Sequence, residues 1–146
     1  MKNLFILLSI AIFTFYSCDN APAKDKDHSN VTAQENKLEV IDFYGTHRCI
    51  TCEAIEANTQ YTLETFFKDE LASGKITFKL INVDEKENYD MAEKFEATGT
   101  ALFFNVIVDH KETIIDLTDF AFMKGKDKEA FSEDLKLKIE NELVKL

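Results

Sequence analysis

Apolar residues divide the chain into segments of strand length and segments with a helical repeat. Residues 38–44 form an apolar run of strand length, and residues 102–108 are nearly all apolar, as is typical of a strand buried on both faces. Residues 76–83 alternate apolar and polar side chains, and residues 113–117 follow the turn at 109–112 as an outer strand. The pattern therefore predicts four strands.

Three helices are predicted between and after these strands. The first covers residues 49–70 and ends at Ser73-Gly74, where a glycine commonly closes a helix. A short helix is expected over 88–95, and a longer amphipathic one over 128–146. The apolar stripes of the two long helices consist of Ile55, Leu63, Phe66 and Phe67, and of Phe131, Leu135, Ile139 and Leu143.

The order β-α-β-α-β-β-α predicts an α/β domain over residues 38–146. Strand, helix, strand implies a parallel pair with a right-handed crossover, and the tightly joined last two strands should be antiparallel. About 109 residues are enough for one compact core. We therefore expect a central mixed four-stranded sheet with helices on both faces.

The first residues differ from this domain. Residues 1–17 have the form of a signal peptide, with Lys2, an apolar run too short to span a bilayer, and a small residue at its end. Phe15-Tyr16-Ser17-Cys18 resembles a bacterial lipobox, which implies cleavage before Cys18 and a lipid on that cysteine. The alternative is an ordinary signal that leaves Cys18 as a lone thiol. Residues 18–37 are polar and predict a flexible tether.

Charge narrows the possible partners. Removal of residues 1–17 changes the formal net charge from −10 to −11, because the segment contains one lysine and no acid. Such a surface repels phosphate backbones and anionic headgroups, so binding to nucleic acid is excluded. We expect membrane contact only through the lipid on Cys18, with the domain facing the periplasm or the cell surface.

The candidate chemistry lies in His47-Arg48-Cys49-Ile50-Thr51-Cys52, directly after a buried strand and at the start of a helix. A helix N-terminus stabilises a thiolate, which makes Cys49 the nucleophile, and Cys52 is close enough to attack a mixed disulfide. Arg48 and His47 add positive charge. A redox dithiol needs no other cofactor.

Two other interpretations of the cysteine pair remain open. His47, Cys49 and Cys52 could bind a soft metal such as copper, or arsenic, although no fourth ligand is evident. A purely structural disulfide would gain little stability, because it closes so small a loop. The spacing therefore favours a redox dithiol.

The segment Ile41-Asp42-Phe43-Tyr44, a short turn and the Cys49-x-x-Cys52 motif resemble the strand, turn and helix of thioredoxins. Residues 95–102 resemble the thioredoxin segment that ends before the next strand. The resemblance implies a thioredoxin-like three-layer fold, with Asp42 as a proton relay and Thr100 and Ala101 as the substrate loop. An outward-facing Asp42 is the alternative. The family's proline is missing from the loop, because Pro22 is the only proline.

More narrowly, Arg48-Cys49-Ile50-Thr51-Cys52 and the residues after it resemble the bacterial nitrophenyl-compound nitroreductase subunit of the ArsF type, a name that suggests a redox accessory role. We expect an envelope thiol-disulfide oxidoreductase or electron carrier. Its substrates would be protein or small-molecule thiols and disulfides, and a membrane electron donor would supply it as a reductant. A carrier of copper or arsenic, or an adaptor with inactive thiols, are the alternatives.

Overall fold

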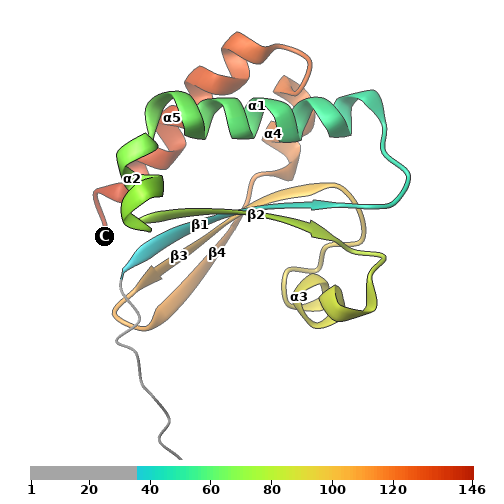
Figure 1. Ribbon diagram of the computed structural model, residues 1–146, viewed down its shortest axis with the longest axis horizontal. Coiled ribbons are helices and arrows are strands. Elements are labelled where there is room, and N and C mark those ends of the chain that lie inside the picture. The colour runs from blue at the N-terminus through green and yellow to red at the C-terminus, as the bar shows by residue number, and fades with distance from the viewer. Residues whose placement is uncertain (1–35) are drawn as a thin grey trace, which may run out of the picture. The chain divides into compact units, whose positions relative to one another are not determined.

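A mixed four-stranded sheet forms the centre of the computed structural model, which describes residues 36–146 (Figure 1). The strands are β1 (Lys37–Tyr44), β2 (Ile76–Asn82), β3 (Ala101–Val108) and β4 (Lys111–Asp116), in the spatial order β2-β1-β3-β4. β1 is parallel to β2 and antiparallel to β3, and β3 is antiparallel to β4. The predicted sheet and its mixed directions are confirmed.

Helices cover both faces of this sheet, with α1, α2, α4 and α5 on one face and α3 on the other (Figure 1). Their bounds are α1 (Ile50–Phe66), α2 (Lys68–Ser73), α3 (Tyr89–Lys94), α4 (Thr118–Lys124) and α5 (Lys128–Leu143), with a 3-10 turn, η1 (Lys86–Asn88), before α3. The three predicted helices are present. The sequence pattern did not predict α4, which lies between β4 and α5.

The predicted helix over residues 49–70 is divided into α1 and α2 at Phe67. Phe67 leaves the helical conformation at φ −131°, and its N–H still donates to the Leu63 carbonyl at 3.0 Å. The change of direction buries the Phe67 ring and leaves Phe66 44% exposed, so the prediction of Phe66 in the buried stripe is wrong. Gly74 ends α2 in the left-handed conformation at φ 77°, as expected for a helix C-terminal glycine.

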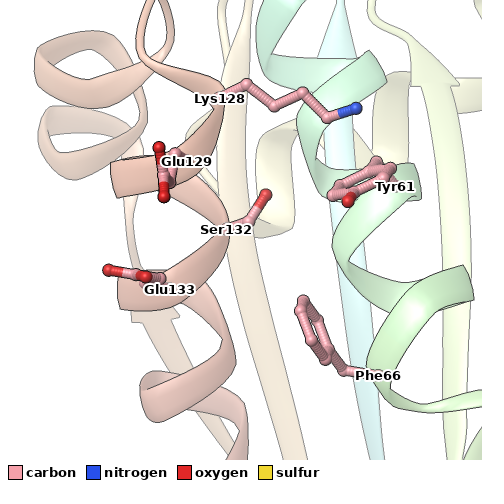
Figure 2. A pocket seen from close by; sticks show the side chains of 6 residues that line it. All are labelled: Tyr61, Phe66, Lys128, Glu129, Ser132 and Glu133. Carbon is pink, nitrogen blue, oxygen red and sulfur yellow. The ribbon is translucent and has the colours of Figure 1, made fainter.

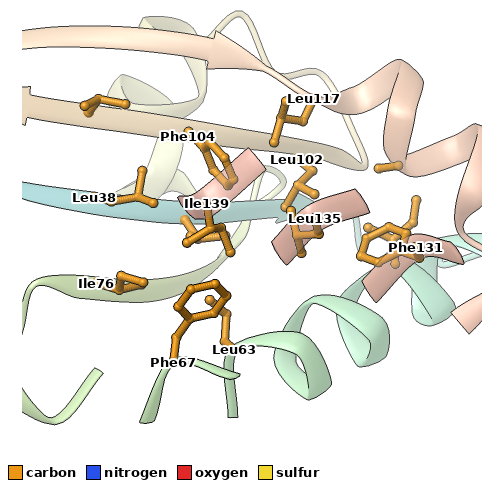
Figure 3. Close-up of a cluster of buried hydrophobic side chains, with 14 residues drawn as sticks. Leu38, Leu63, Phe67, Ile76, Leu102, Phe104, Leu117, Phe131, Leu135 and Ile139 are labelled. Carbon is orange, nitrogen blue, oxygen red and sulfur yellow. The ribbon is translucent and has the colours of Figure 1, made fainter. Parts of the chain in front are cut away.

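The main core lies between the sheet and the layer of α1 and α5 (Figure 3). Leu38 and Val40 of β1 meet Phe131, Leu135 and Ile139, which the four-residue repeat predicted to face inward, and all five are fully buried. Burial of each such side chain stabilises the fold by roughly 1.5–3 kcal/mol. This packing fixes α5 over β1.

A smaller core on the opposite face contains three phenylalanine rings that lie close together. The ring centroids of Phe43, Phe95 and Phe103 lie 5.4–5.8 Å apart, and two of the three pairs are edge-to-face. Such aromatic pairs add about 0.5–1.5 kcal/mol beyond the area that they bury. The cluster anchors the end of β1 from which the chain continues to the cysteine motif.

The link between α4 and α5 approaches α1 closely at Gly125. A Cβ atom at this position would lie 2.8 Å from the Ala121 carbonyl oxygen, 3.0 Å from Ile55 Cγ1 and 3.2 Å from Thr51 Cγ2. The Asn58 side chain donates to the Gly125 carbonyl at 2.9 Å. The absence of a side chain at Gly125 therefore allows this link to pack against the first turns of α1.

The predicted signal peptide over residues 1–17, the predicted lipid attachment at Cys18 and the predicted tether as far as residue 35 lie outside the described residues. Within residues 36–146, no helix is both long enough and apolar enough to cross a membrane.

Candidate redox site

Cys49 and Cys52 form a disulfide at the N-terminus of α1, with their Cα atoms 5.0 Å apart. Cys49 is extended, at φ −92° and ψ 159°, and is the N-cap of the helix, where its Sγ accepts a hydrogen bond from the Cys52 N–H at 3.1 Å. Cys49 is exposed, whereas Cys52 is only 7% exposed. An external thiolate can therefore reach the Cys49 sulfur more easily than the Cys52 sulfur.

The loop 45–48, which leads from β1 to the dithiol, is held by the segment that follows β2. The Val83 N–H donates to the Tyr44 carbonyl at 2.9 Å, and the Thr46 N–H donates to Asp84 Oδ2 at 2.7 Å. The bond from Thr46 holds the pKa of the Asp84 carboxyl below its usual range. These contacts fix the course of the loop before Cys49.

Arg48, the last residue of this loop, contacts α1 through its side chain. Its Nη1 forms an ion pair with Glu56, and its Nη2 donates to the Cys52 carbonyl at 3.3 Å. The guanidinium carbon also lies 4.7 Å from the centroid of the Tyr44 ring. The sequence indicated Arg48 and placed Glu56 one turn into the helix, but it did not predict that the two residues pair. Glu56 shares a helix face with Cys52 because it follows Cys52 by four residues.

His47 is exposed in the same loop. Among residues 36–146, no three or more histidine, cysteine, aspartate or glutamate side chains are grouped so that they could hold a metal ion. The structure therefore does not bring His47, Cys49 and Cys52 together as a metal site, and the metal-carrier alternative gains no support from it.

Asp42 is completely buried in β1, and neither carboxylate oxygen has a hydrogen-bond partner. It lies on the same face of the strand as Leu38 and Val40, because residues two apart share a face, and α1 covers this face. Burial, with a further contribution from Glu56, raises the pKa of Asp42 to about 7, against the opposing effect of Arg48. The outward-facing alternative for Asp42 is thus wrong, and its carboxyl can exchange a proton near neutral pH.

Thr100 and Ala101 lie at the end of the sheet that carries the loop 45–48. Ala101 is the first residue of β3 and pairs with Phe43 near the end of β1. The next residue, Leu102, donates its N–H to Thr118 Oγ1 at 3.3 Å. A hollow of about 280 Å³ borders this segment, and its lining includes Thr98, Gly99, Thr100 and Ala101. The predicted substrate loop is therefore placed at the dithiol end of the sheet.

A larger hollow, of about 450 Å³, lies between α1 and α5 (Figure 2). Tyr61 and Phe66 of α1 border it, and Lys128 of α5 extends over the Tyr61 ring, with its ammonium nitrogen 3.3 Å from the ring centroid. Neither cysteine lines this hollow, so it is separate from the dithiol.

Comparisons with solved structures return thioredoxins. Fasciola hepatica thioredoxin is 22% identical, with 60% of this chain and 76% of that chain covered and a TM-score of 0.39. Oxidised mitochondrial thioredoxin 3 from Saccharomyces cerevisiae is 26% identical, with 62% and 77% covered and a TM-score of 0.40. The germline-specific thioredoxin Deadhead of Drosophila melanogaster is 22% identical, with 68% and 90% covered and a TM-score of 0.40. No protein-family model and no curated protein matches the chain.

The fold assignment rests on the strand order and on the position of the cysteine pair. A sheet ordered β2-β1-β3-β4, with a Cys-x-x-Cys motif that opens the helix after the central strand β1, has the thioredoxin-like arrangement. The protein therefore has a thioredoxin-like fold, with a disulfide between Cys49 and Cys52.

Proposed function

We propose that this protein is a thiol-disulfide oxidoreductase that uses Cys49 and Cys52. The observation that carries the proposal is the asymmetry of the pair: an exposed sulfur at a helix N-terminus is joined to a buried sulfur. Partial positive charge at the helix N-terminus stabilises a thiolate at Cys49. The buried Asp42 carboxyl provides a proton acceptor beneath α1.

In the reducing direction, the Cys49 thiolate attacks one sulfur of a substrate disulfide. The substrate S–S bond breaks, one substrate thiolate leaves, and a mixed disulfide joins Cys49 to the other half. The Cys52 thiol then passes its proton to Asp42 and attacks the Cys49 sulfur. The Cys49–Cys52 disulfide forms, the second substrate thiolate leaves, and two electrons have moved to the substrate. The oxidising direction is the reverse.

A redox titration against glutathione buffers tests the proposal. The fraction of the Cys49–Cys52 disulfide is measured by mass spectrometry after alkylation, over a range of ratios of reduced to oxidised glutathione. A catalytic couple should exchange within this range. A reduction potential below about −300 mV would identify a stable structural bond and refute the oxidoreductase function.

Trapping of the mixed disulfide separates the roles of the two cysteines. With Cys52→Ser, a disulfide-bonded peptide should remain attached to Cys49, because no resolving thiol is present. With Cys49→Ser, attachment should be much slower, since the buried Cys52 is then the only thiol of the pair. Equal trapping by both variants would contradict the assigned roles.

We further propose that the protein works in the bacterial envelope, anchored by a lipid on Cys18. The support is the lipobox-like Phe15-Tyr16-Ser17-Cys18 and the polar residues that follow it. In that compartment a membrane electron donor would keep the dithiol reduced, and the substrate could be a protein or a small thiol. The Arg48-Cys49-Ile50-Thr51-Cys52 motif supports an accessory redox role like that of the ArsF-type family. Labelling with radioactive palmitate should be lost with Cys18→Ala, and labelling that persists would disprove the anchor.

A further inference from the structure

The Arg48 side chain, at the end of the loop 45–48, forms an ion pair with Glu56 of α1. Within residues 36–146, Glu56 is the sole carboxylate paired with Arg48. The same guanidinium donates to the Cys52 carbonyl and lies over the Tyr44 ring. The side chains of Arg48 and Glu56 are 21% and 24% exposed, so water screens the pair only partly. One cation is thus fixed at the first turn of α1, beside the buried cysteine.

We propose that Glu56 is a positioning residue for the dithiol, which holds the Arg48 guanidinium at the Cys52 carbonyl so that its charge stabilises the reduced form. This inference rests on the proposed thiol-disulfide exchange. Reduction of the disulfide creates a thiolate, and a cation held nearby lowers the free energy of that thiolate. A long arginine side chain without an anchor would move toward solvent, where its charge is screened.

Loss of Glu56 should shift the dithiol–disulfide equilibrium in the direction opposite to the one that the loss of its charge alone would cause. Loss of Glu56 removes a negative charge, and this alone would favour the thiolate and therefore the reduced form. If Glu56 acts by holding Arg48, its loss also releases the cation, and the equilibrium moves toward the disulfide. The direction of the shift therefore distinguishes positioning from charge.

The experiment measures the equilibrium between the protein dithiol and oxidised glutathione, which yields the protein disulfide and two molecules of reduced glutathione. Glu56→Ala should shift this equilibrium threefold to tenfold toward the disulfide, where tenfold corresponds to about 30 mV. Arg48→Met should shift it in the same direction. In the Arg48→Met background, Glu56→Ala should change the equilibrium less than twofold. Glu56→Gln keeps an oxygen that can accept from the guanidinium, so its shift toward the disulfide should be smaller.

Glu53→Ala is the matched control. Glu53 is exposed on the same helix, lies closer to Cys52 in sequence, and forms no ion pair among residues 36–146. Its loss should change the equilibrium less than twofold or favour the reduced form. Far-ultraviolet circular dichroism and the unfolding midpoint of the oxidised protein check that each variant is folded.

A shift toward the reduced form with Glu56→Ala would overturn the proposal. Additive effects of Glu56→Ala and Arg48→Met would also overturn it, because Glu56 would then act independently of Arg48. If the wild-type protein does not exchange with glutathione, the proposed function itself fails. Exchange by the wild type with an unchanged equilibrium in Glu56→Ala refutes the positioning role alone.

Discussion

Asp42→Asn should make the protein more stable at neutral pH and leave its stability nearly unchanged in acid. The Asp42 carboxyl is completely buried without a hydrogen-bond partner, and burial raises its pKa from the ordinary value of 3.8 to about 7. Above pH 7 the folded protein must hold a buried negative charge that the unfolded chain exposes to water. The asparagine amide has nearly the same shape and no charge at any pH.

The sign and size of this effect follow from the two pKa values. Between pH 4 and pH 7 the folded state binds a proton at Asp42 that the unfolded state has released, so wild-type stability falls as the pH rises through this range. The difference of about 3 between the pKa values corresponds to about 4 kcal/mol. The advantage of Asp42→Asn should therefore grow from near zero below pH 4 to about 4 kcal/mol above pH 7 and then remain constant.

Urea unfolding of the oxidised protein at half-unit steps from pH 4 to pH 8 measures this difference. With a typical slope of about 2 kcal/mol per molar urea, the midpoints of variant and wild type should separate by about 2 M at pH 8. Asp84→Asn is the control with the opposite sign, because the pKa of Asp84 is lowered by its hydrogen bond from Thr46 and its charge stabilises the fold at neutral pH. A difference between Asp42→Asn and wild type that does not change with pH would refute the burial of an ionisable Asp42.

Three further predictions concern other parts of the domain. Hydrogen bonds from Lys37, Lys79 and Asn105 outweigh burial and lower the pKa of Glu39 to about 2. Glu39→Gln should therefore lower the free energy of unfolding by about 2 kcal/mol at pH 7 and by much less at pH 2, as measured by urea unfolding. Gly125→Ala should lower stability by about 1–3 kcal/mol in thermal unfolding, because the new Cβ has no room, and an unchanged melting temperature would contradict that contact. After reduction, brief alkylation followed by peptide mapping should label the exposed Cys49 before the buried Cys52, and equal labelling would contradict their assigned burial.

The helices and strands that the sequence predicts best are those whose buried side chains form long, regular runs or repeats of apolar residues. β1 and β3 were recognised from continuous apolar runs, and α5 from a stripe that repeats every four residues. α4 contains only seven residues, too few to establish a helical repeat, and its position depends on contacts with α1 at Gly125. The break at Phe67 was missed for a related reason, because the apolar repeat continues across it.

The sequence predicts the position of some residues of the redox site better than that of others. The positions of Cys49 and Cys52 at a helix start follow from local sequence, and the burial of Asp42 could have been inferred from its alternation with Leu38 and Val40. The contact between Arg48 and Glu56 depends on the course of the loop before the helix, which no residue pattern specifies. The spacing of the two cysteines therefore indicates the reacting sulfur atoms. Only the three-dimensional course of the loop 45–48 shows which side chains surround them.

The contact between Gly125 and α1 affects the order in which the redox site is assembled during folding. Cys49 and Cys52 are three residues apart and can meet as soon as the first turn of α1 exists. The support behind that turn arrives much later in the chain, since Asn58 and Gly125 are 67 residues apart in sequence. Contacts so distant in sequence form slowly, because a long loop must close first. The disulfide can thus close before the site is complete, and the link between α4 and α5 packs against the first turns of α1 afterwards.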